Sequence, residues 1–396
     1  ADDGTWVVPS QSAGGTYRVL TWPGAESCGC EDFQLRQEPC KHIIAARLVE
    51  ERERKRPAPA IDVDTPPKKR TYEQNWPAYD LAQTTEKHRL QVLLADLCRG
   101  LPEPPPPKCG RRPVCIADRI FSCAFKVYCG LSSRRYICDM TDAVGRGHLS
   151  RPVHYSKVCA FLSNPDLTAP LRELVMRSAL PLKAVETDFA VDSSGFSTRK
   201  FVRWFDHKYG VTRQEHDWVK VHVCTGVKTG VVTAVEIRDR DAADSPLLPP
   251  LVQATAAGGF AMKEVSADKG YLSAENVNMI DAVGAVPFIA PKCNTNGAAG
   301  GLFERMYHYY SFNREDFLRH YHKRSNVESV FSAVKRKFGD AIRSRNDVAM
   351  VNEVLCKFLC HNLCCIILSQ IELGINAAFW PEDGETRDVL PLIRRG

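Results

Sequence analysis

The chain has 396 residues, 44% of them hydrophobic, and a formal net charge of +6 at pH 7. This length predicts two or three domains with ordinary soluble cores. The charge excess is too small to indicate a nucleic-acid partner by itself, so the placement of the basic residues has to decide that question.

The most apolar stretch, 348–375, contains Glu353, Lys357, His361 and Glu372. A membrane span needs about 18 or more consecutive apolar residues, so we predict a buried helix here and no membrane association. No secretory signal opens the sequence, and because residue 1 is not Met we expect the natural chain to begin earlier. Most of the 16 cysteines lie in apolar segments, where a free thiol behaves as a small hydrophobe. We therefore expect a reducing, cytoplasmic environment.

Residues 1–50 form the first predicted unit. Cys28 and Cys30, then nine residues, then Cys40 and His42 supply three thiols and an imidazole, the ligand types that tetrahedral zinc prefers. Scattered thiols in a cysteine-rich chain are the simpler alternative, but the strict spacing favours zinc. The spacing, followed by a helical pattern, resembles the SWIM zinc finger, a small module fused to transposases and other DNA-associated proteins.

A linker and a helical region follow. Charged and proline-rich residues over 51–75 predict an exposed linker, and residues 76–180 are helical in pattern. Within them, 134–143 and 152–162 flank a glycine-containing turn. This arrangement is equally consistent with a DNA-binding helix-turn-helix and with any helical pair joined by such a turn, so both interpretations stay open.

From residue 181 onward the pattern changes to strands and helices. Strict alternation predicts a first strand at 185–192. Further strands and helices follow in mixed order, which predicts an α/β domain over 181–396, with a mixed sheet flanked by helices. The other predicted strands are 219–225, 231–237, 262–267 and 285–290, and the predicted helices are 249–257, 273–283, 314–338 and 348–371.

Two carboxylates lie at the ends of predicted strands. Asp192 shares a strand face with Glu186 and Asp188 and lies where we expect that strand to end, and Asp268 lies at the end of the strand before Lys269. Phosphodiester cleavage with two divalent ions about 4 Å apart needs several such hard oxygen ligands. For either aspartate alone, a turn or helix cap is the better interpretation.

A third carboxylate lies in an unusual stripe. Tyr321, Arg324, Glu328 and Lys335 fall within about 60° of one another on a helix of about 100° per residue. The neighbouring sector is apolar, which predicts a helix docked on the core with these four polar side chains along its rim. A merely solvated face gives no reason for this combination. The apolar residues are Val327, Val330, Phe331, Val334 and Phe338.

The spacing Tyr-x2-Arg-x3-Glu-x6-Lys resembles the signature of bacterial insertion-sequence transposases of the DDE class, which have a ribonuclease-H-like core. Asp192-Ser-Ser resembles the first aspartate motif of that family with one conservative departure, and Asp268-Lys-Gly-Tyr271 resembles the second. The resemblance runs from about residue 75 to the end. Because only 60 residues separate Asp268 from Glu328, we predict no large β-rich insertion between them.

This resemblance implies catalytic residues Asp192, Asp268 and Glu328, which would hold magnesium or manganese. It also implies that Tyr321, Arg324 and Lys335 bind the DNA of the transposon end. The segment 314–345 carries nine Lys/Arg against four Asp/Glu, a basic strip suited to a DNA backbone.

The function that the resemblance implies is cut-and-paste transposition, with cleavage at the inverted-repeat ends and strand transfer into target DNA. We expect a homodimer when two ends are paired, in a bacterial cytoplasm and associated with the nucleoid. A domesticated zinc-finger regulator that binds DNA without cutting is the main alternative. A missing carboxylate would favour a decayed copy that no longer cuts, but none is missing here. A structure-specific repair nuclease on the same fold would share the acids but would not need the Tyr-Arg-Glu-Lys row.

Overall fold

The computed structural model describes residues 5–9, 15–22, 24–54, 75–105, 108–110, 112–198, 218–239, 241–292 and 295–380. The chain divides into two compact units, Ala1–Glu73 and Gln74–Gly396. Most of the predicted linker, residues 55–74, lies outside the described residues. The predicted division of the larger unit between residues 180 and 181 remains a prediction.

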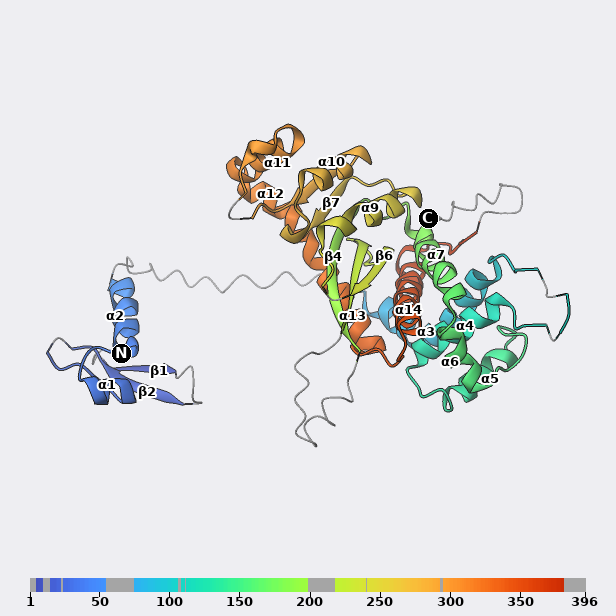
Figure 1. Ribbon diagram of the computed structural model, residues 1–396, viewed down its shortest axis with the longest axis horizontal. Coiled ribbons are helices and arrows are strands. Elements are labelled where there is room, and N and C mark those ends of the chain that lie inside the picture. The colour runs from blue at the N-terminus through green and yellow to red at the C-terminus, as the bar shows by residue number, and fades with distance from the viewer. Residues whose placement is uncertain are drawn as a thin grey trace. The chain divides into compact units, whose positions relative to one another are not determined.

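The N-terminal unit is a small three-stranded antiparallel sheet with two helices (Figure 1). Its core is Val19, Ile43 and Ala46 together with three buried cysteines, and Trp6, Val8, Tyr17 and Phe33 pack against this core. Such a small apolar core is a weak basis for stability, so another source of cohesion is needed. The strands are β1 (Thr5–Pro9), β2 (Thr16–Leu20) and β3 (Ser27–Cys28), and the helices are α1 (Glu31–Arg36) and α2 (Lys41–Arg54).

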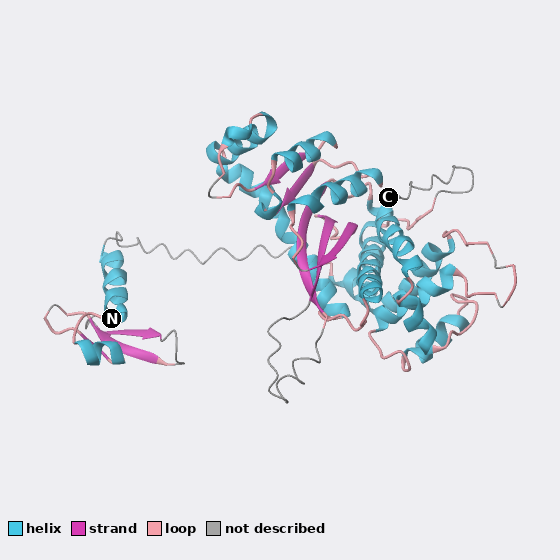
Figure 2. Ribbon diagram, viewed as in Figure 1, coloured by secondary structure: helices cyan, strands magenta, loops and turns pink. Residues whose placement is uncertain are grey.

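The larger unit begins with helices, most of which pack against the long helix α14 (Asp347–Leu373). Asn75 caps the first of them through a hydrogen bond from the amide of Ala78 (3.2 Å), as is typical of helix starts. Figure 2 shows this helical part beside the strands. The helices are α3 (Trp76–Arg99), α4 (Ile116–Cys129), α5 (Tyr136–Gly145), α6 (Tyr155–Leu162) and α7 (Thr168–Ala179).

Helix α14 is long and apolar enough to cross a membrane by length and composition, but 67% of its most apolar window is buried inside the fold. It packs against α3, α4 and α7. Its few polar side chains are used internally: Asn362 bonds to backbone groups of Val232 and Val175, with distances of 2.7–3.0 Å. This is the environment of a core helix.

The mixed sheet has the strand order β6-β5-β4-β7-β8. Strands β4, β5 and β6 are antiparallel neighbours, whereas β4, β7 and β8 are parallel. Helix α9 packs against β5 and β6, and α13 packs against β4. The elements are β4 (Asp188–Ser197), β5 (Trp218–Gly226), β6 (Val232–Asp239), α9 (Leu248–Ala257), β7 (Glu264–Ala267), α10 (Ala274–Ala282), β8 (Val286–Ile289), α11 (Gly301–Phe312), α12 (Arg314–Tyr321) and α13 (Ser325–Phe338).

The first strand extends further than predicted. Strand β4 continues past Asp192 to Ser197, because it pairs with β5 as far as Trp218. Gly195 permits this pairing: a Cβ at that position would lie 1.8 Å from the Trp218 indole, so only glycine fits. On its other edge β4 pairs with β7 only from Asp188 to Val191. The edge of β4 is therefore free of β7 from Asp192 onward, although the strand itself does not end there.

The prediction of one continuous helix over 314–338 is wrong. The chain forms α12, then a 3-10 turn at His322–Arg324, then α13. The tighter turn carries Lys323 and Arg324, which reach different residues of β4. Helix α11 was not predicted, although its half-buried residues Leu302, Phe303, Met306, Tyr307 and Tyr310 recur at helical spacing.

Candidate active site and zinc-binding site

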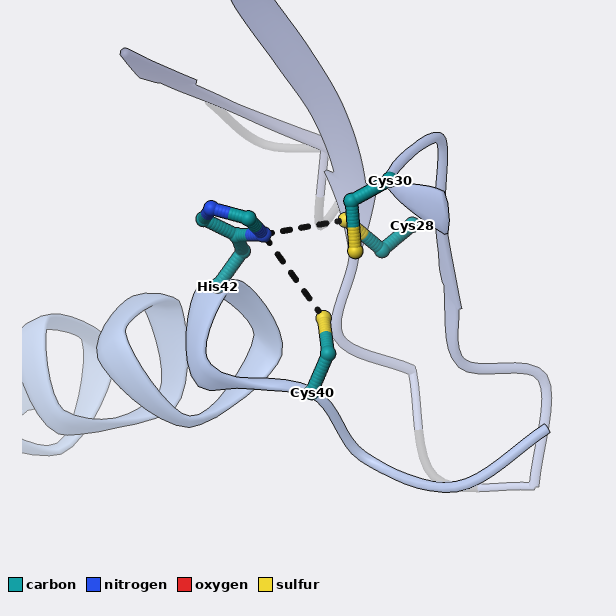
Figure 3. A group of neighbouring side chains, drawn as sticks. All are labelled: Cys28, Cys30, Cys40 and His42. Carbon is teal, nitrogen blue, oxygen red and sulfur yellow. Dashed lines mark hydrogen bonds between the residues drawn. The ribbon is translucent and has the colours of Figure 1, made fainter. Parts of the chain in front are cut away.

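Four side chains of the N-terminal unit converge on one point (Figure 3). The ligand atoms of Cys28, Cys30, Cys40 and His42 are buried and lie within 4.8 Å of one another. His42 Nδ1 is 3.7 Å from Cys28 Sγ and 3.9 Å from Cys40 Sγ. In a tetrahedral site with bonds of about 2.0–2.3 Å, neighbouring ligand atoms lie about 3.5–3.8 Å apart. The donor types and their spacing therefore fit zinc.

Local structure presents these four groups. Cys28 ends the short strand β3, and Cys30 and Cys40 each directly precede a helix, their carbonyls accepting bonds from Gln34 (3.1 Å) and Ile44 (3.1 Å). Helix N-termini favour negative charge, and therefore thiolates. His42 lies in the first turn of α2, with its ring against Tyr17 at a centroid distance of 4.7 Å.

The thiols have different proton affinities. Burial raises the pKa of Cys28 to about 12. Burial also acts to raise the pKa of Cys40, but hydrogen bonds from the backbone of Ile43 and His42 and from the neighbouring cysteines lower it overall. A divalent cation stabilises thiolates, so it would remove the cost of burying a charged Cys28.

In the larger unit, the two predicted aspartates lie on neighbouring strands, each directly after the last residue that pairs β4 with β7. Val191 and Ala267 are the last paired residues of β4 and β7, so Asp192 and Asp268 follow them side by side. Burial raises the pKa of Asp192, and the negative charges of Asp268 and Glu328 raise it further, while Ser193 and Arg324 act in the opposite direction. Asp268 and Glu328 are thus close enough to Asp192 to affect its ionisation.

Arg324 connects this group. Its guanidinium donates to Asp192 Oδ2 at 2.5 Å and to Glu328 Oε1 at 2.9 Å. Although burial acts to lower the pKa of Arg324, the charges of Asp192, Tyr321, Glu328 and Asp268 raise it. The pKa of Tyr321 is raised by burial and by the nearby Asp268. One cation therefore lies among all three predicted acids and beside the predicted tyrosine.

Lys335 lies further along the same face of β4. Its ammonium donates to Ser194 Oγ at 2.7 Å and lies 5.2 Å from the centre of the Phe196 ring, and burial lowers its pKa. Among the described residues it forms no ion pair with a carboxylate. A cavity of about 550 Å³ opens beside it, lined by Asp192, Ser193, Ser194, Glu328, Phe331, Ser332, Lys335 and Arg336.

The remaining acids on the predicted strand face have other partners. Asp188 Oδ2 accepts a bond from Lys323 Nζ at 2.7 Å, and the same ammonium binds Glu264 Oε2 at 2.7 Å. Glu186 is almost completely buried and accepts backbone bonds from Lys228 (3.1 Å) and Thr229 (2.5 Å). Asp188 therefore ties the 3-10 turn to the start of β4, and Glu186 stabilises the β5–β6 turn.

Sequence reasoning missed Lys323, which binds Asp188 and Glu264 from the position directly before Arg324. It also missed Asp244, whose carboxylate lies beside Ser193 (3.3 Å). Lys323 lies between Tyr321 and Arg324 in the sequence, but it is not one of the four residues that form the stripe. Asp244 lies in the loop that follows the predicted strand 231–237, and no local pattern distinguishes it from the other aspartates of that loop.

Comparison with family models gives two matches. Residues 183–363 match the transposase DDE domain, and residues 17–48 match the SWIM zinc finger. Comparisons with curated proteins and with solved structures give no significant match. The DDE match includes Asp192, Asp268 and Glu328, and the SWIM match includes Cys28, Cys30, Cys40 and His42. The chain therefore carries a transposase DDE domain behind an N-terminal SWIM zinc finger.

Proposed function

We propose that the protein is a DNA transposase that cuts at the ends of its element and joins them to target DNA, with Asp192, Asp268 and Glu328 as its catalytic carboxylates. The observation that carries the proposal is the grouping of these three acids around Arg324, from two neighbouring strands and one helix. The three acids are far apart in the sequence, so a shared function is the reason we infer for their lying together.

The donor set fits magnesium or manganese. Three carboxylates supply hard oxygen ligands, and burial together with mutual repulsion disfavours the ionised form of Asp192 unless a cation is present. Two such ions, when bound, activate water or a 3′-hydroxyl and stabilise the leaving oxygen. Asp192, Asp268 and Glu328 would hold them, and Ser193 would keep Asp192 oriented through its backbone bond of 2.8 Å.

The DNA would lie along the other side chains of the signature. Lys335 and Arg336 line the cavity beside Asp192, and phosphates are natural partners for cations that, like these two among the described residues, form no ion pair with a carboxylate. In this proposal Tyr321, Arg324 and Lys335 bind the transposon end, and Arg324 exchanges a carboxylate for a phosphate when DNA is present. The net positive charge of segment 314–345 supports a backbone contact.

The strand order supports a ribonuclease-H-like core. Three antiparallel strands are followed by two strands parallel to the first of them, with helices α9 and α13 packed on the sheet. Zinc in the SWIM finger, pairing of two ends by a homodimer, and a bacterial, nucleoid-associated location complete the proposal.

The test uses the full chain and a linear DNA that contains its own gene with several hundred flanking base pairs on each side. With Mg²⁺ or Mn²⁺, the protein should release a fragment whose two ends map to matching inverted repeats, and Asp192→Asn should release none. Tight binding to the flanks without cleavage in either metal would contradict the proposal and favour the non-cutting regulator.

A further inference from the structure

A second polar cluster lies on the opposite face of the sheet from Asp192. Because side chains alternate along β4, Ser193 points away from the face that carries Asp192 and Arg324. Its hydroxyl donates to Asp244 Oδ1 at 3.3 Å. The same carboxylate oxygen pairs with Lys220 Nζ of β5 at 2.6 Å. Asp244 thus holds the residue whose amide binds Asp192, and it does so from behind the sheet.

Asp244 also lies against the turn that carries Asp268. A Cβ on Gly270 would lie 3.1 Å from Asp244 Oδ2 and 3.6 Å from Asp268 Oδ2. The carboxylates of Asp268 and Asp244 therefore both approach Gly270, and that of Asp244 does so from the loop after β6. Close approach of this kind explains a glycine at position 270, where the backbone needs no unusual conformation.

Buried hydrogen bonds fix the two loops relative to each other. Asn276, which is 2% exposed, donates to the carbonyls of Tyr271 (2.7 Å) and Ser245 (2.9 Å). The hydroxyl of Tyr271 bonds to His222 Nδ1 on β5 at 2.8 Å, and that nitrogen lies 3.7 Å from Asp244 Oδ1. The loop after β6 and the loop after β7 are thereby held against the same part of the sheet.

We propose that Asp244 is a positioning residue for the metal site: it orients Ser193 behind Asp192 and supports the Gly270 turn behind Asp268, so that the two metal-holding carboxylates keep their separation. The inference rests on the proposed function. Since Lys220 neutralises Asp244, the residue adds little net charge to the acid group, and its contribution is geometric. Partners that orient metal ligands in this way typically change metal affinity or activity by about 10- to 100-fold when removed.

Asp244→Asn in the full chain tests the proposal, with Mn²⁺ as the probe. Binding of Mn²⁺ is followed by electron paramagnetic resonance, and cleavage of the gene-and-flanks DNA is followed at increasing Mn²⁺ concentrations. The variant should need about ten-fold more Mn²⁺ for half-maximal binding and cleavage, while its DNA dissociation constant measured in Ca²⁺ stays within about two-fold. Asp239→Asn is the matched control, because Asp239 is an exposed acid at the end of β6 and should behave like the unaltered protein.

If Asp244→Asn does not fold, Ser193→Ala takes its place and should shift the Mn²⁺ requirement in the same direction by about three- to five-fold. An unchanged Mn²⁺ requirement in the folded variant, or an equal shift in Asp239→Asn, overturns the positioning role. In that case Asp192→Asn would still abolish Mn²⁺ binding, and the proposed function would stand. If the unaltered protein neither binds Mn²⁺ nor cuts, the proposed function fails, and this inference fails with it.

Discussion

The two units of this chain obtain their folds in different ways. In the N-terminal unit, three of the six residues of the buried core are the cysteines of the cluster. In the larger unit the core is a continuous apolar set that joins α14, the sheet and helices α3 to α7, and Asp192, Asp268 and Glu328 lie outside this set. In our proposal, metal has opposite roles in the two units: zinc builds the fold of the first unit, whereas the fold of the second unit builds a site for magnesium or manganese.

The largest effect should follow from removing zinc. Chelation or Cys40→Ser should unfold residues up to about 50, since binding of structural zinc contributes about 10–16 kcal/mol in comparable fingers. The thermal transition of the larger unit should be unchanged. Metal analysis, limited proteolysis and calorimetry measure these two effects separately. Cys109→Ser is the matched control, because Cys109 is an exposed cysteine outside the cluster. A finger that stays protease-resistant without metal would contradict the role of zinc in building the first unit.

A substitution that leaves a cavity in the core of the larger unit should destabilise that unit and leave the zinc finger unchanged. Phe358 is fully buried on α14, and the centre of its ring lies 6.1 Å from the ring centres of Phe196 and Phe331. Phe358→Ala should lower the free energy of unfolding of this unit by about 3–5 kcal/mol without releasing zinc. Denaturant unfolding compared with Phe312→Ala, whose side chain is 80% exposed, measures the difference. Equal losses in the two variants would show that this core is not what stabilises the unit.

Acid should weaken the larger unit through histidines that are buried without charge. Burial lowers the pKa of His222 and of His361 to about 4. The unfolded chain therefore takes up protons first as the pH falls below about 6.5, and stability present above that pH is lost progressively toward pH 4. At pH 5 each histidine should cost about 2 kcal/mol.

His361→Gln, which can still donate a bond to the Gly230 carbonyl, should remove about half of this pH dependence. Urea unfolding at pH 7 and pH 5 measures it. A variant with the same pH dependence as the unaltered chain would exclude His361 as a contributor.

The smallest effect concerns DNA affinity. Lys335→Ala or Arg324→Ala should weaken binding of the flanking DNA about five-fold and reduce the salt dependence by about one ion for each lost phosphate contact. Arg305→Ala, an exposed cation on α11 outside the basic strip, should change neither quantity. Binding measured at several salt concentrations distinguishes these cases, and an unchanged salt dependence in Lys335→Ala would remove that residue from the DNA contact.

Much of the site could be predicted because its signals are local. The Cys-x-Cys and Cys-x-His pairs and the Tyr-Arg-Glu-Lys spacing each lie within one turn or one helical segment, and the domain identities they implied are confirmed by the family matches. Features that depend on pairing between distant segments could not be predicted. The continuation of β4 to Ser197 depends on Trp218, and the contact of Asp244 with Ser193 joins residues 51 positions apart.

The 3-10 turn at His322–Arg324 is an intermediate case. The periodicity of the segment predicted the shared face of Arg324 and Glu328 correctly, because the two residues remain in contact (2.9 Å). It could not reveal the local tightening, since that coincides with the contacts of Lys323 to Asp188 and Glu264 on two neighbouring strands.

Glu328→Gln tests the central claim most directly. The substitution keeps the size and hydrogen bonding of the side chain but removes a charged metal ligand. The variant should bind the flanking DNA as tightly as the unaltered protein, or slightly more tightly because a negative charge near the phosphates is gone, and should release no fragment in Mg²⁺ or Mn²⁺. Binding and cleavage measured on the same preparation give both values. Cleavage by Glu328→Gln at a rate comparable to that of the unaltered protein would contradict the transposase mechanism.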